Sequence, residues 1–396
     1  MTRALFRRQL ASLLIVIALL TPWGAVSAVQ SVSQDSSRLA GRRNIGRVLD
    51  KLRAGKAVTI AYLGGSITAG AGASDPSKTS YRALLTESMR TRYPHSRITE
   101  INAAVIGTGS LYASMRARRD VIAHKPDLVF VEFAVYDAAE KEDVAKRAME
   151  GIVRQLLTVS QPPEIVFVYA TNPARAARVE WHEAVARYYR LPSVNLQDQV
   201  WSMFDAGAAV QASFWTNGLN TSDEGHRVFA KLIGDFILDQ EKQTSSELVK
   251  SLQPPFLSDE LTYGELIPVA QLKHEATWRN EPVADRALPS HLLVSDKAGT
   301  QFETVFEGTV AGLAYRMGPD GGSMECLIDG KPAPAPLAKI DTYDATHHIA
   351  ASIISGLGPG EHRLTVRLIA DKNVKSVGTQ IRLGYLLVGG QRPERL

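Results

Sequence analysis

Residues 57–68 read Ala-Val-Thr-Ile-Ala-Tyr-Leu-Gly-Gly-Ser-Ile-Thr, and this segment indicates the fold class. Its first seven residues form a largely apolar run, which is typical of a strand buried on both faces of a parallel sheet. Gly64 and Gly65 then allow a sharp turn that exposes the side chain of Ser66. Because α/β proteins place ligands at the carboxyl ends of parallel strands, Ser66 is the first candidate site residue.

Strand and helix patterns alternate after this stretch. Strands are predicted at 98–104, 127–134, 164–171 and 193–196, and helices at 81–93, 110–119, 141–159, 180–189 and 221–238. This alternation predicts a parallel sheet with helices on both faces. Beyond Gln253-Pro254-Pro255 the pattern changes to short strands at 324–328, 348–354, 362–369 and 381–388, separated by turn signals such as Asp329-Gly330. The second part of the chain is therefore predicted to be an all-β sandwich, jelly-roll-like in type.

The first residues predict export. Arg3, Arg7 and Arg8 precede an apolar run over 10–20, and Val26-Ser27-Ala28 offers small residues for cleavage. The run is short for a membrane span, so we expect a bacterial-type signal peptide over 1–28, with an uncleaved anchor as the alternative. The mature protein would be periplasmic or extracellular, with no membrane span.

Charge and cysteine content narrow the expected partners. Without the three arginines of the signal the net charge falls from +4 to +1, and no basic stripe with interleaved aromatic residues is present. We therefore expect no nucleic-acid partner. Cys326 is the only cysteine, which excludes an internal disulfide, and its alternating surroundings predict a small buried side chain. The sequence indicates no oligomeric state.

Three further segments accompany Gly64–Thr68, namely Asn102–Ser110, Pro126–Asp137 and Phe214–His226. Their order resembles the SGNH (GDSL-type) ester hydrolases, in particular the subgroup whose first block reads Gly-Gly-Ser-Ile-Thr. That subgroup often carries a C-terminal β domain with three short motifs, matched here by Gly318-Pro319-Asp320, Ile328-Asp329-Gly330 and Gly360-Glu361-His362. The polar, irregular residues after the signal predict an N-terminal arm or lead-in helix over 29–55, and the shift in composition predicts a linker over 243–262. Between and after these segments, the resemblance implies a three-layer, flavodoxin-like SGNH domain over 56–242 and a β-sandwich over 263–396.

The same resemblance implies roles for five residues. Ser66 matches the nucleophile, and the backbone N–H groups of Ser66 and Gly107 would hold the oxyanion of acyl transfer. Tyr136 stands where the family has an oxyanion-binding Asn, and Asn217 and Asn220 stand where it has Asp and His. A Tyr ring is bulkier than an Asn side chain and is expected to fill the oxyanion site, and Asn220 cannot accept a proton from Ser66 at neutral pH. The nucleophile position is thus kept without the groups that activate it.

Asp223 and His226 repeat the Asp-x-x-His spacing and form an alternative base pair. One interpretation is structural, because Thr221-Ser222-Asp223-Glu224 is typical of a capping box, which places His226 inside the last helix. The other is that His226 activates Ser66, with Asp223 orienting it. A hydrogen bond between His226 and Ser66 would favour the second interpretation.

None of the remaining candidate residues indicates a cofactor site. His182 is expected to be a surface or packing residue, and Asp137 a turn or cap. His347 and His348 are adjacent on a predicted strand and point to opposite faces, so they are not expected to share a metal. No metal or cofactor site is predicted.

These observations favour an exported, catalytically degenerate SGNH-like protein that binds, or assists work on, an envelope or extracellular polysaccharide. Its expected ligand is a carbohydrate or acylated polysaccharide, which follows from family context. The alternative is an active serine esterase or O-acyltransferase that deacetylates or acetylates a glycan, using Ser66 with a non-standard base such as His226.

Overall fold

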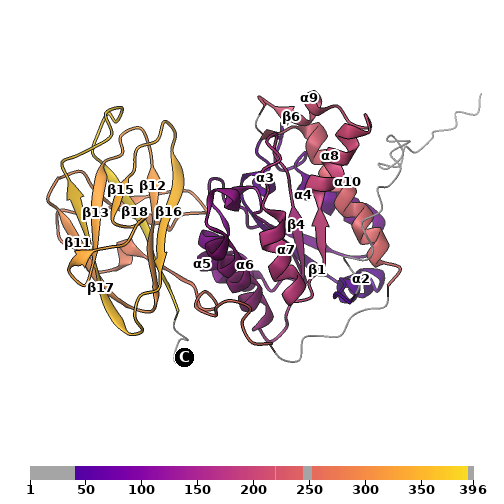
Figure 1. Ribbon diagram of the computed structural model, residues 1–396, viewed down its shortest axis with the longest axis horizontal. Coiled ribbons are helices and arrows are strands. Elements are labelled where there is room, and N and C mark those ends of the chain that lie inside the picture. Colours follow the sequence, from indigo (N-terminus) through magenta and orange to yellow (C-terminus); the bar gives the residue numbers. More distant parts are fainter. Residues whose placement is uncertain (1–40, 219, 244–251, 391–396) are drawn as a thin grey trace, which may run out of the picture. The chain divides into compact units, whose positions relative to one another are not determined.

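The structure is a computed structural model that describes residues 41–218, 220–243 and 252–390 (Figure 1). The predicted signal peptide lies outside the described residues, as do part of the predicted arm and part of the predicted linker. Among the residues described, no helix is both long and apolar enough to cross a bilayer.

Five parallel strands form the central sheet of the first domain. They are β1 (Val58–Gly64), β2 (Ile98–Asn102), β3 (Leu128–Glu132), β4 (Glu164–Tyr169) and β5 (Ser193–Asn195). Their order is β2-β1-β3-β4-β5, which is the flavodoxin-like order. The predicted parallel sheet is confirmed. The chain reverses its direction of winding at β1 and β3, and at this point Gly64 lies opposite Glu132.

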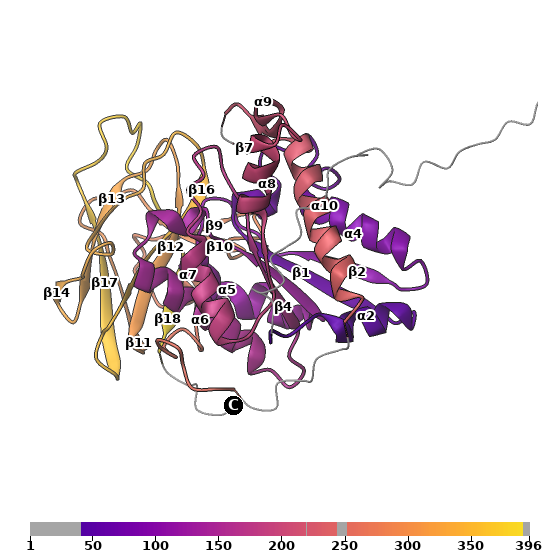
Figure 2. The same cartoon turned by 45° about the vertical axis from the view of Figure 1, so that its right-hand side comes forward.

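Helices cover both faces of this sheet, as predicted (Figures 1 and 2). One face packs against α2 (Gly46–Arg53), α4 (Tyr81–Arg92), α8 (Leu196–Asp205) and α10 (Asp223–Gln240). The other packs against α5 (Ser110–Asp120), α6 (Glu142–Leu157) and α7 (Val179–Tyr188). Along β1 the buried side chains alternate, with Ile60 and Tyr62 in the first core and Ala61 and Leu63 in the second.

Short elements complete the first domain. They are α3 (Ser66–Ala69), α9 (Gln211–Phe214), β6 (Trp215–Thr216), β7 (Asn220–Thr221) and the 3-10 turns η1 (Ile122–His124) and η2 (Tyr136–Ala139). The sequence patterns predicted neither α8 nor α9, and they started the last helix two residues before α10 begins.

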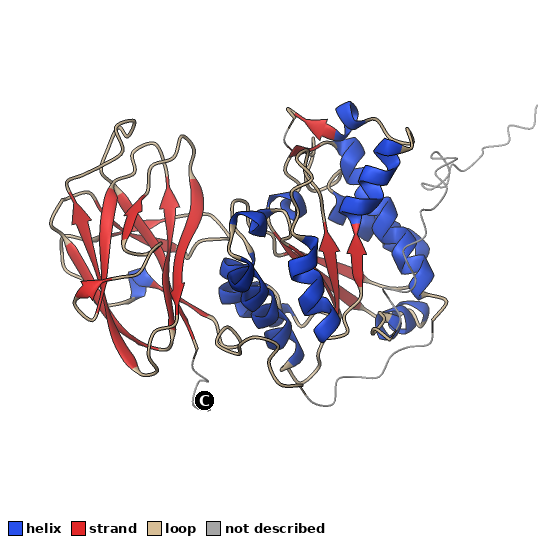
Figure 3. Cartoon of the chain, in the orientation of Figure 1, coloured by secondary structure: helices blue, strands red, loops and turns tan. Residues whose placement is uncertain are grey.

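The C-terminal domain is an antiparallel all-β sandwich, as predicted (Figure 3). One sheet contains β8 (Glu265–Pro268), β9 (Arg279–Pro282), β10 (His291–Ser295), β12 (Val310–Met317), β16 (His348–Ser355) and β18 (Ile381–Gly389). The other contains β11 (Gln301–Glu307), β13 (Ser323–Ile328), β14 (Lys331–Pro332), β15 (Lys339–Asp341) and β17 (Glu361–Ile369). The 3-10 turn η3 (Val269–Gln271) follows β8. Cys326 is buried in the core between the sheets, as predicted.

The two domains belong to one compact unit and share a hydrophobic core. Tyr112 and Met115 of α5 pack there with Leu292, Ile349 and Tyr385 of the β domain. The guanidinium of Arg119 also donates a hydrogen bond to the hydroxyl of Tyr385. A shared apolar core of this kind fixes α5 against the β domain.

Candidate functional site

Ser66 begins α3 directly after β1, at the carboxyl edge of the sheet. A Cβ on Gly64 would lie 2.2 Å from Oγ1 of Thr68, so only glycine fits at the end of the strand. Gly65 approaches the next loop in the same way, because a Cβ there would lie 3.3 Å from the carbonyl oxygen of Thr108. The two glycines therefore bring Ser66 against the loop that follows β2.

A buried polar network links this turn to Glu132 of β3 and Tyr81 of α4. Oγ1 of Thr68 donates to Oε2 of Glu132 over 2.9 Å and lies 2.8 Å from the hydroxyl of Tyr81. Burial raises the pKa of Glu132 to about 7. Sequence reasoning missed this group, since Glu132 sits in an apolar strand pattern. A charged residue inside such a pattern is itself a signal, because carboxylates are rarely buried without partners.

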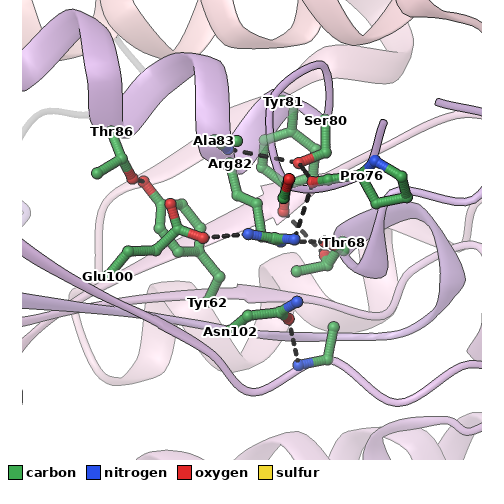
Figure 4. A network of polar contacts seen from close by, with 12 residues as sticks. Tyr62, Thr68, Pro76, Ser80, Tyr81, Arg82, Ala83, Thr86, Glu100 and Asn102 are labelled. Carbon is green, nitrogen blue, oxygen red and sulfur yellow. Dashed lines mark hydrogen bonds and ion pairs between the residues drawn. The ribbon is translucent and has the colours of Figure 1, made fainter. Parts of the chain in front are cut away.

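Arg82 fastens the same turn to α4 and β2. Its Nε donates to the carbonyl oxygen of Thr68 over 3.2 Å, and Nη2 donates to that of Pro76 over 3.0 Å. Its Nη1 forms a half-buried ion pair with Glu100 (Figure 4). The backbone on either side of the α3–α4 loop is thus held by one guanidinium.

Gly107 lies in the loop after β2, with φ of +77°, a conformation that favours glycine. The loop is joined to β1 by a hydrogen bond of 3.1 Å from the N–H of Val105 to the carbonyl oxygen of Gly64. In the described part of the chain, the N–H groups of Ser66 and Gly107 donate to no acceptor. Two backbone donors at the same edge of the sheet are thereby left free.

Tyr136 and Asp137 hold the two ends of the Gly107–Ser110 segment. The Tyr136 hydroxyl donates to the carbonyl oxygen of Gly107, and the N–H of Ser110 donates to Oδ1 of Asp137 over 2.9 Å. Asp137 therefore acts as a cap, as expected, but on α5. Tyr136 remains 40 % exposed. Because its hydroxyl proton is directed at Gly107, it is not available to an oxyanion in this arrangement.

His182 lies behind Asp137 and is buried, with Nε2 2.9 Å from Oδ2 of the carboxylate. The sequence predicted a surface or packing residue, and only the packing alternative agrees with this position. The helical spacing of His182, Val185, Ala186 and Tyr189 places them on one face of the predicted helix over 180–189, a signal that could have identified the burial of His182. The carboxylate of Asp137 thus joins the ring of His182 to the N–H of Ser110, so the pair fixes the loop.

Asn217 and Asn220 lie on the β6–β7 hairpin. Asn217 is exposed at the tip and has φ of +54°, and Gly218 after it has φ of +63°. Asn and Gly adopt such conformations at low cost, so the turn explains both residues. Asn220 lies against Gly72, because a Cβ added to Gly72 would come within 2.7 Å of the Cβ of Asn220. The hairpin therefore packs on the segment that follows α3.

The side chains of Asp223 and His226 form hydrogen bonds with groups other than Ser66. Asp223 accepts hydrogen bonds from the N–H and Oγ of Ser74 and from Oγ1 of Thr79, which lower its pKa to about 2. His226 is fully buried, and its Nδ1 accepts from the N–H of Tyr81 over 3.3 Å. Burial lowers the pKa of His226 to about 4. Ser222, one residue after the Thr221 of the predicted capping box, caps α10 by accepting from the N–H of Gly225.

Two cavities bear on where a ligand fits. A groove of about 410 Å³ runs from Gly107–Gly109 past Tyr136, Glu140 and Ile353. A larger pocket of about 640 Å³ is lined by Lys51, Pro126 and Pro163, which lie at the amino ends of the strands. Ligands of open α/β sheets bind at the carboxyl ends, so the smaller groove is the relevant one. Within residues 41–218, 220–243 and 252–390, no group of three His, Cys, Asp or Glu side chains could hold a metal.

Comparison with known proteins agrees with this architecture. Residues 62–228 match the model of the GDSL-like lipase/acylhydrolase family, and this range includes every predicted site residue. This part of the first domain is therefore similar in sequence to the GDSL-like lipase/acylhydrolase family.

One solved protein resembles nearly the whole chain. It is a two-domain esterase (CEX) active on acetylated mannans, co-crystallised with mannopentaose, at 22 % identity and a TM-score of 0.78 over 89 % of this chain and 97 % of that one. A second structure of a two-domain esterase (CEX) active on acetylated mannans gives 23 % identity and a TM-score of 0.75 over 88 % of this chain and 96 % of that one. No curated protein matches the chain. The predicted combination of an SGNH-type sheet and a C-terminal β domain is thus confirmed as a fold.

Proposed function

We propose that this protein is exported and holds an acyl group of a polysaccharide in the site around Ser66 without cleaving it. One observation carries the proposal. Among the described residues, the N–H groups of Ser66 and Gly107 have no acceptor, while Ser66 Oγ has no hydrogen bond to any acid or base. The site thus keeps its donors for a carbonyl oxygen and lacks a group that could activate the hydroxyl.

The two free donors suit a carbonyl oxygen. Backbone N–H groups aimed at one point stabilise partial negative charge on an acyl oxygen, and they require no side chain to do so. An ester or amide carbonyl carries such charge in its ground state, so the same donors bind an intact acyl group. Gly107 is well suited to this task because its conformation is fixed through its own carbonyl by Tyr136.

The hydroxyl of Ser66 needs a base to become a nucleophile. Asn220 occupies the position that the family resemblance gives to His, and an amide cannot take up the proton. His226 is directed into the packing of α4 and α10 through Tyr81. Removing the base from a serine hydrolase costs on the order of 10⁶ in kcat. An intact ester is therefore expected to remain intact in this site.

The polysaccharide part of the proposal draws support from the structural neighbour, an esterase active on acetylated mannans that was co-crystallised with mannopentaose. A shared fold does not by itself transfer a ligand, so this part depends on a binding measurement. Export is supported by the basic and apolar pattern of residues 1–28.

The test is calorimetric titration of the protein with partially O-acetylated mannopentaose and with the same oligosaccharide after alkaline deacetylation. We expect at least tenfold tighter binding of the acetylated probe, no release of acetate, and unchanged binding by Ser66→Ala. Labelling by a fluorophosphonate serine probe should not depend on Ser66. Acetate release and probe labelling that both disappear in Ser66→Ala would contradict the proposal and establish the esterase alternative.

A further inference from the structure

The β domain reaches the Gly107 loop and holds it. Arg286, between β9 and β10, donates hydrogen bonds to the carbonyl oxygens of Asn102 and Ala104, just ahead of Gly107. Residues of β16 pack with α5, which begins directly after the loop. The loop is therefore positioned by both domains, and a ligand at Gly107 would meet side chains of the β domain.

His348, the first residue of β16, is the β-domain side chain beside Gly107. A methyl group built on Gly107 would lie 3.7 Å from Cδ2 of His348 and 3.8 Å from the carbonyl oxygen of Ile349. The His348 side chain is 30 % exposed. It therefore borders the loop and remains open to a ligand.

The hydrogen bonding of His348 fixes which ring nitrogen is free. Nδ1 lies 3.3 Å from the carbonyl oxygen of Thr346 and 3.7 Å from Oδ1 of Asp344, and both oxygens can only accept. Nδ1 therefore carries the proton in the neutral ring, and Nε2 becomes an acceptor. In the described residues Nε2 has no hydrogen-bond partner. The β domain thus offers one acceptor beside the loop that carries the N–H of Gly107.

Two side chains near Gly107, those of Ile106 and Tyr136, are large, mainly apolar and exposed. Ile106 is 56 % exposed and Tyr136 is 40 % exposed, so both are among the exposed large apolar side chains of the described chain. An aromatic ring and an aliphatic side chain that flank polar groups are a typical surface for a sugar ring, which has apolar C–H faces and hydroxyl edges.

We infer that His348 is a specificity-determining residue supplied by the β domain, which accepts a hydrogen bond from a hydroxyl group beside the acylated carbon of a glycan. This inference rests on the proposed function, because it assigns the acyl oxygen to the N–H groups of Ser66 and Gly107. The sugar ring then lies against Tyr136 and Ile106, with one hydroxyl directed at Nε2. A glycan fully acylated on that ring lacks the hydroxyl and is bound less tightly.

The experiment compares His348→Ala with His347→Ala in the full-length mature protein. His347 is the matched control, because it is the adjacent residue and its Nδ1 lies 3.1 Å from the carbonyl oxygen of Met317 in the second domain. The probe is partially O-acetylated mannopentaose, measured by calorimetry. We expect at least a tenfold loss of affinity in His348→Ala, less than a twofold change in His347→Ala, and recovery to within threefold of wild type in His348→Gln, which keeps an acceptor.

The outcomes separate the two proposals. Equal affinities for wild type, His348→Ala and His347→Ala would overturn the role of His348 and leave the acyl-binding function standing. No binding by the wild type would overturn the proposed function and, with it, this inference. Acetate release that requires both Ser66 and His348 would make His348 a catalytic base and overturn the recognition role.

Discussion

The hydroxyl of Tyr136 donates a hydrogen bond to the carbonyl oxygen of Gly107, and its neighbour Asp137 accepts one from the N–H of Ser110. Two consecutive residues of the loop after β3 thus hold both ends of the loop after β2. The family resemblance places an Asn at position 136, where its amide would face the ligand. Tyr136 instead acts on the backbone of the loop, which keeps the Gly107 N–H in place.

Replacing Tyr136 by Phe should loosen this loop. The change removes one hydrogen bond and keeps the ring, so affinity for partially O-acetylated mannopentaose should fall three- to tenfold, the equivalent of about 1 kcal/mol. Hydrogen exchange of the Gly107 amide should become faster. Tyr343→Phe is the control, because the Tyr343 hydroxyl makes no hydrogen bond within the described residues. Unchanged exchange and affinity in Tyr136→Phe would contradict a positioning role.

The fold was predictable because it depends on local patterns. The apolar run before Ser66 and the alternation of strands and helices predicted the parallel sheet, and the turn signals after residue 255 predicted the β domain. The helix α8 was missed, since its capping residue Asn195 also ends a strand. Local pattern is sufficient where burial follows the period of one element.

The candidate site was predictable only in part. Ser66 and Gly107 were found because glycine-dependent turns leave a sequence signal. The supporting roles of Glu132 and His182 left no such signal. Glu132 acts through Thr68 and His182 acts through Asp137, and each partner is far away in the sequence. The position of His348 beside Gly107 depends on how two domains pack, which no local pattern records.

Restoring the family residues tests the positional assignment. The triple variant Tyr136→Asn, Asn217→Asp, Asn220→His supplies a base, a group to orient it and a side-chain donor. Position 217 has φ of +54°, which Asp tolerates nearly as well as Asn. We expect hydrolysis of p-nitrophenyl acetate at least about 100-fold above wild type, the usual contribution of a general base. The rise should disappear when Ser66→Ala is added, and a folded but inactive triple variant would count against the assignment.

Gly72 controls the position of the Asn217–Asn220 hairpin. A Cβ at Gly72 would lie 2.3 Å from the carbonyl oxygen of Thr221 and 2.7 Å from Cβ of Asn220, so the hairpin must move. Gly207 is the matched control, since it also has positive φ but nothing lies within 4 Å of an added Cβ. Gly72→Ala should lower the free energy of unfolding by about 2 kcal/mol more than Gly207→Ala, in urea titrations. Equal losses in the two variants would show that backbone strain alone is responsible.

Glu132 should give the stability of the protein a distinct pH dependence. Burial raises its pKa to about 7, whereas an unfolded Glu titrates near 4.3. Between these values the folded protein keeps a proton that the unfolded chain releases. The stability that the protonated carboxyl contributes is therefore complete below about pH 4 and is lost as the pH rises through 7.

The change Glu132→Gln should remove this dependence. Gln is neutral at every pH, and its carbonyl oxygen can still accept from Oγ1 of Thr68, so the network beneath Ser66 is kept. Between pH 4.5 and 7.5 the wild type should lose about 3 kcal/mol more than the variant, since one pKa unit corresponds to roughly 1.4 kcal/mol. The measurement is the free energy of unfolding in urea at several pH values. The exposed Glu325, changed to Gln, is the control and should leave the wild-type curve unaltered. Parallel curves for wild type and Glu132→Gln would mean that Glu132 is ionised throughout this range, and that the turn carrying Ser66 rests on a buried carboxylate.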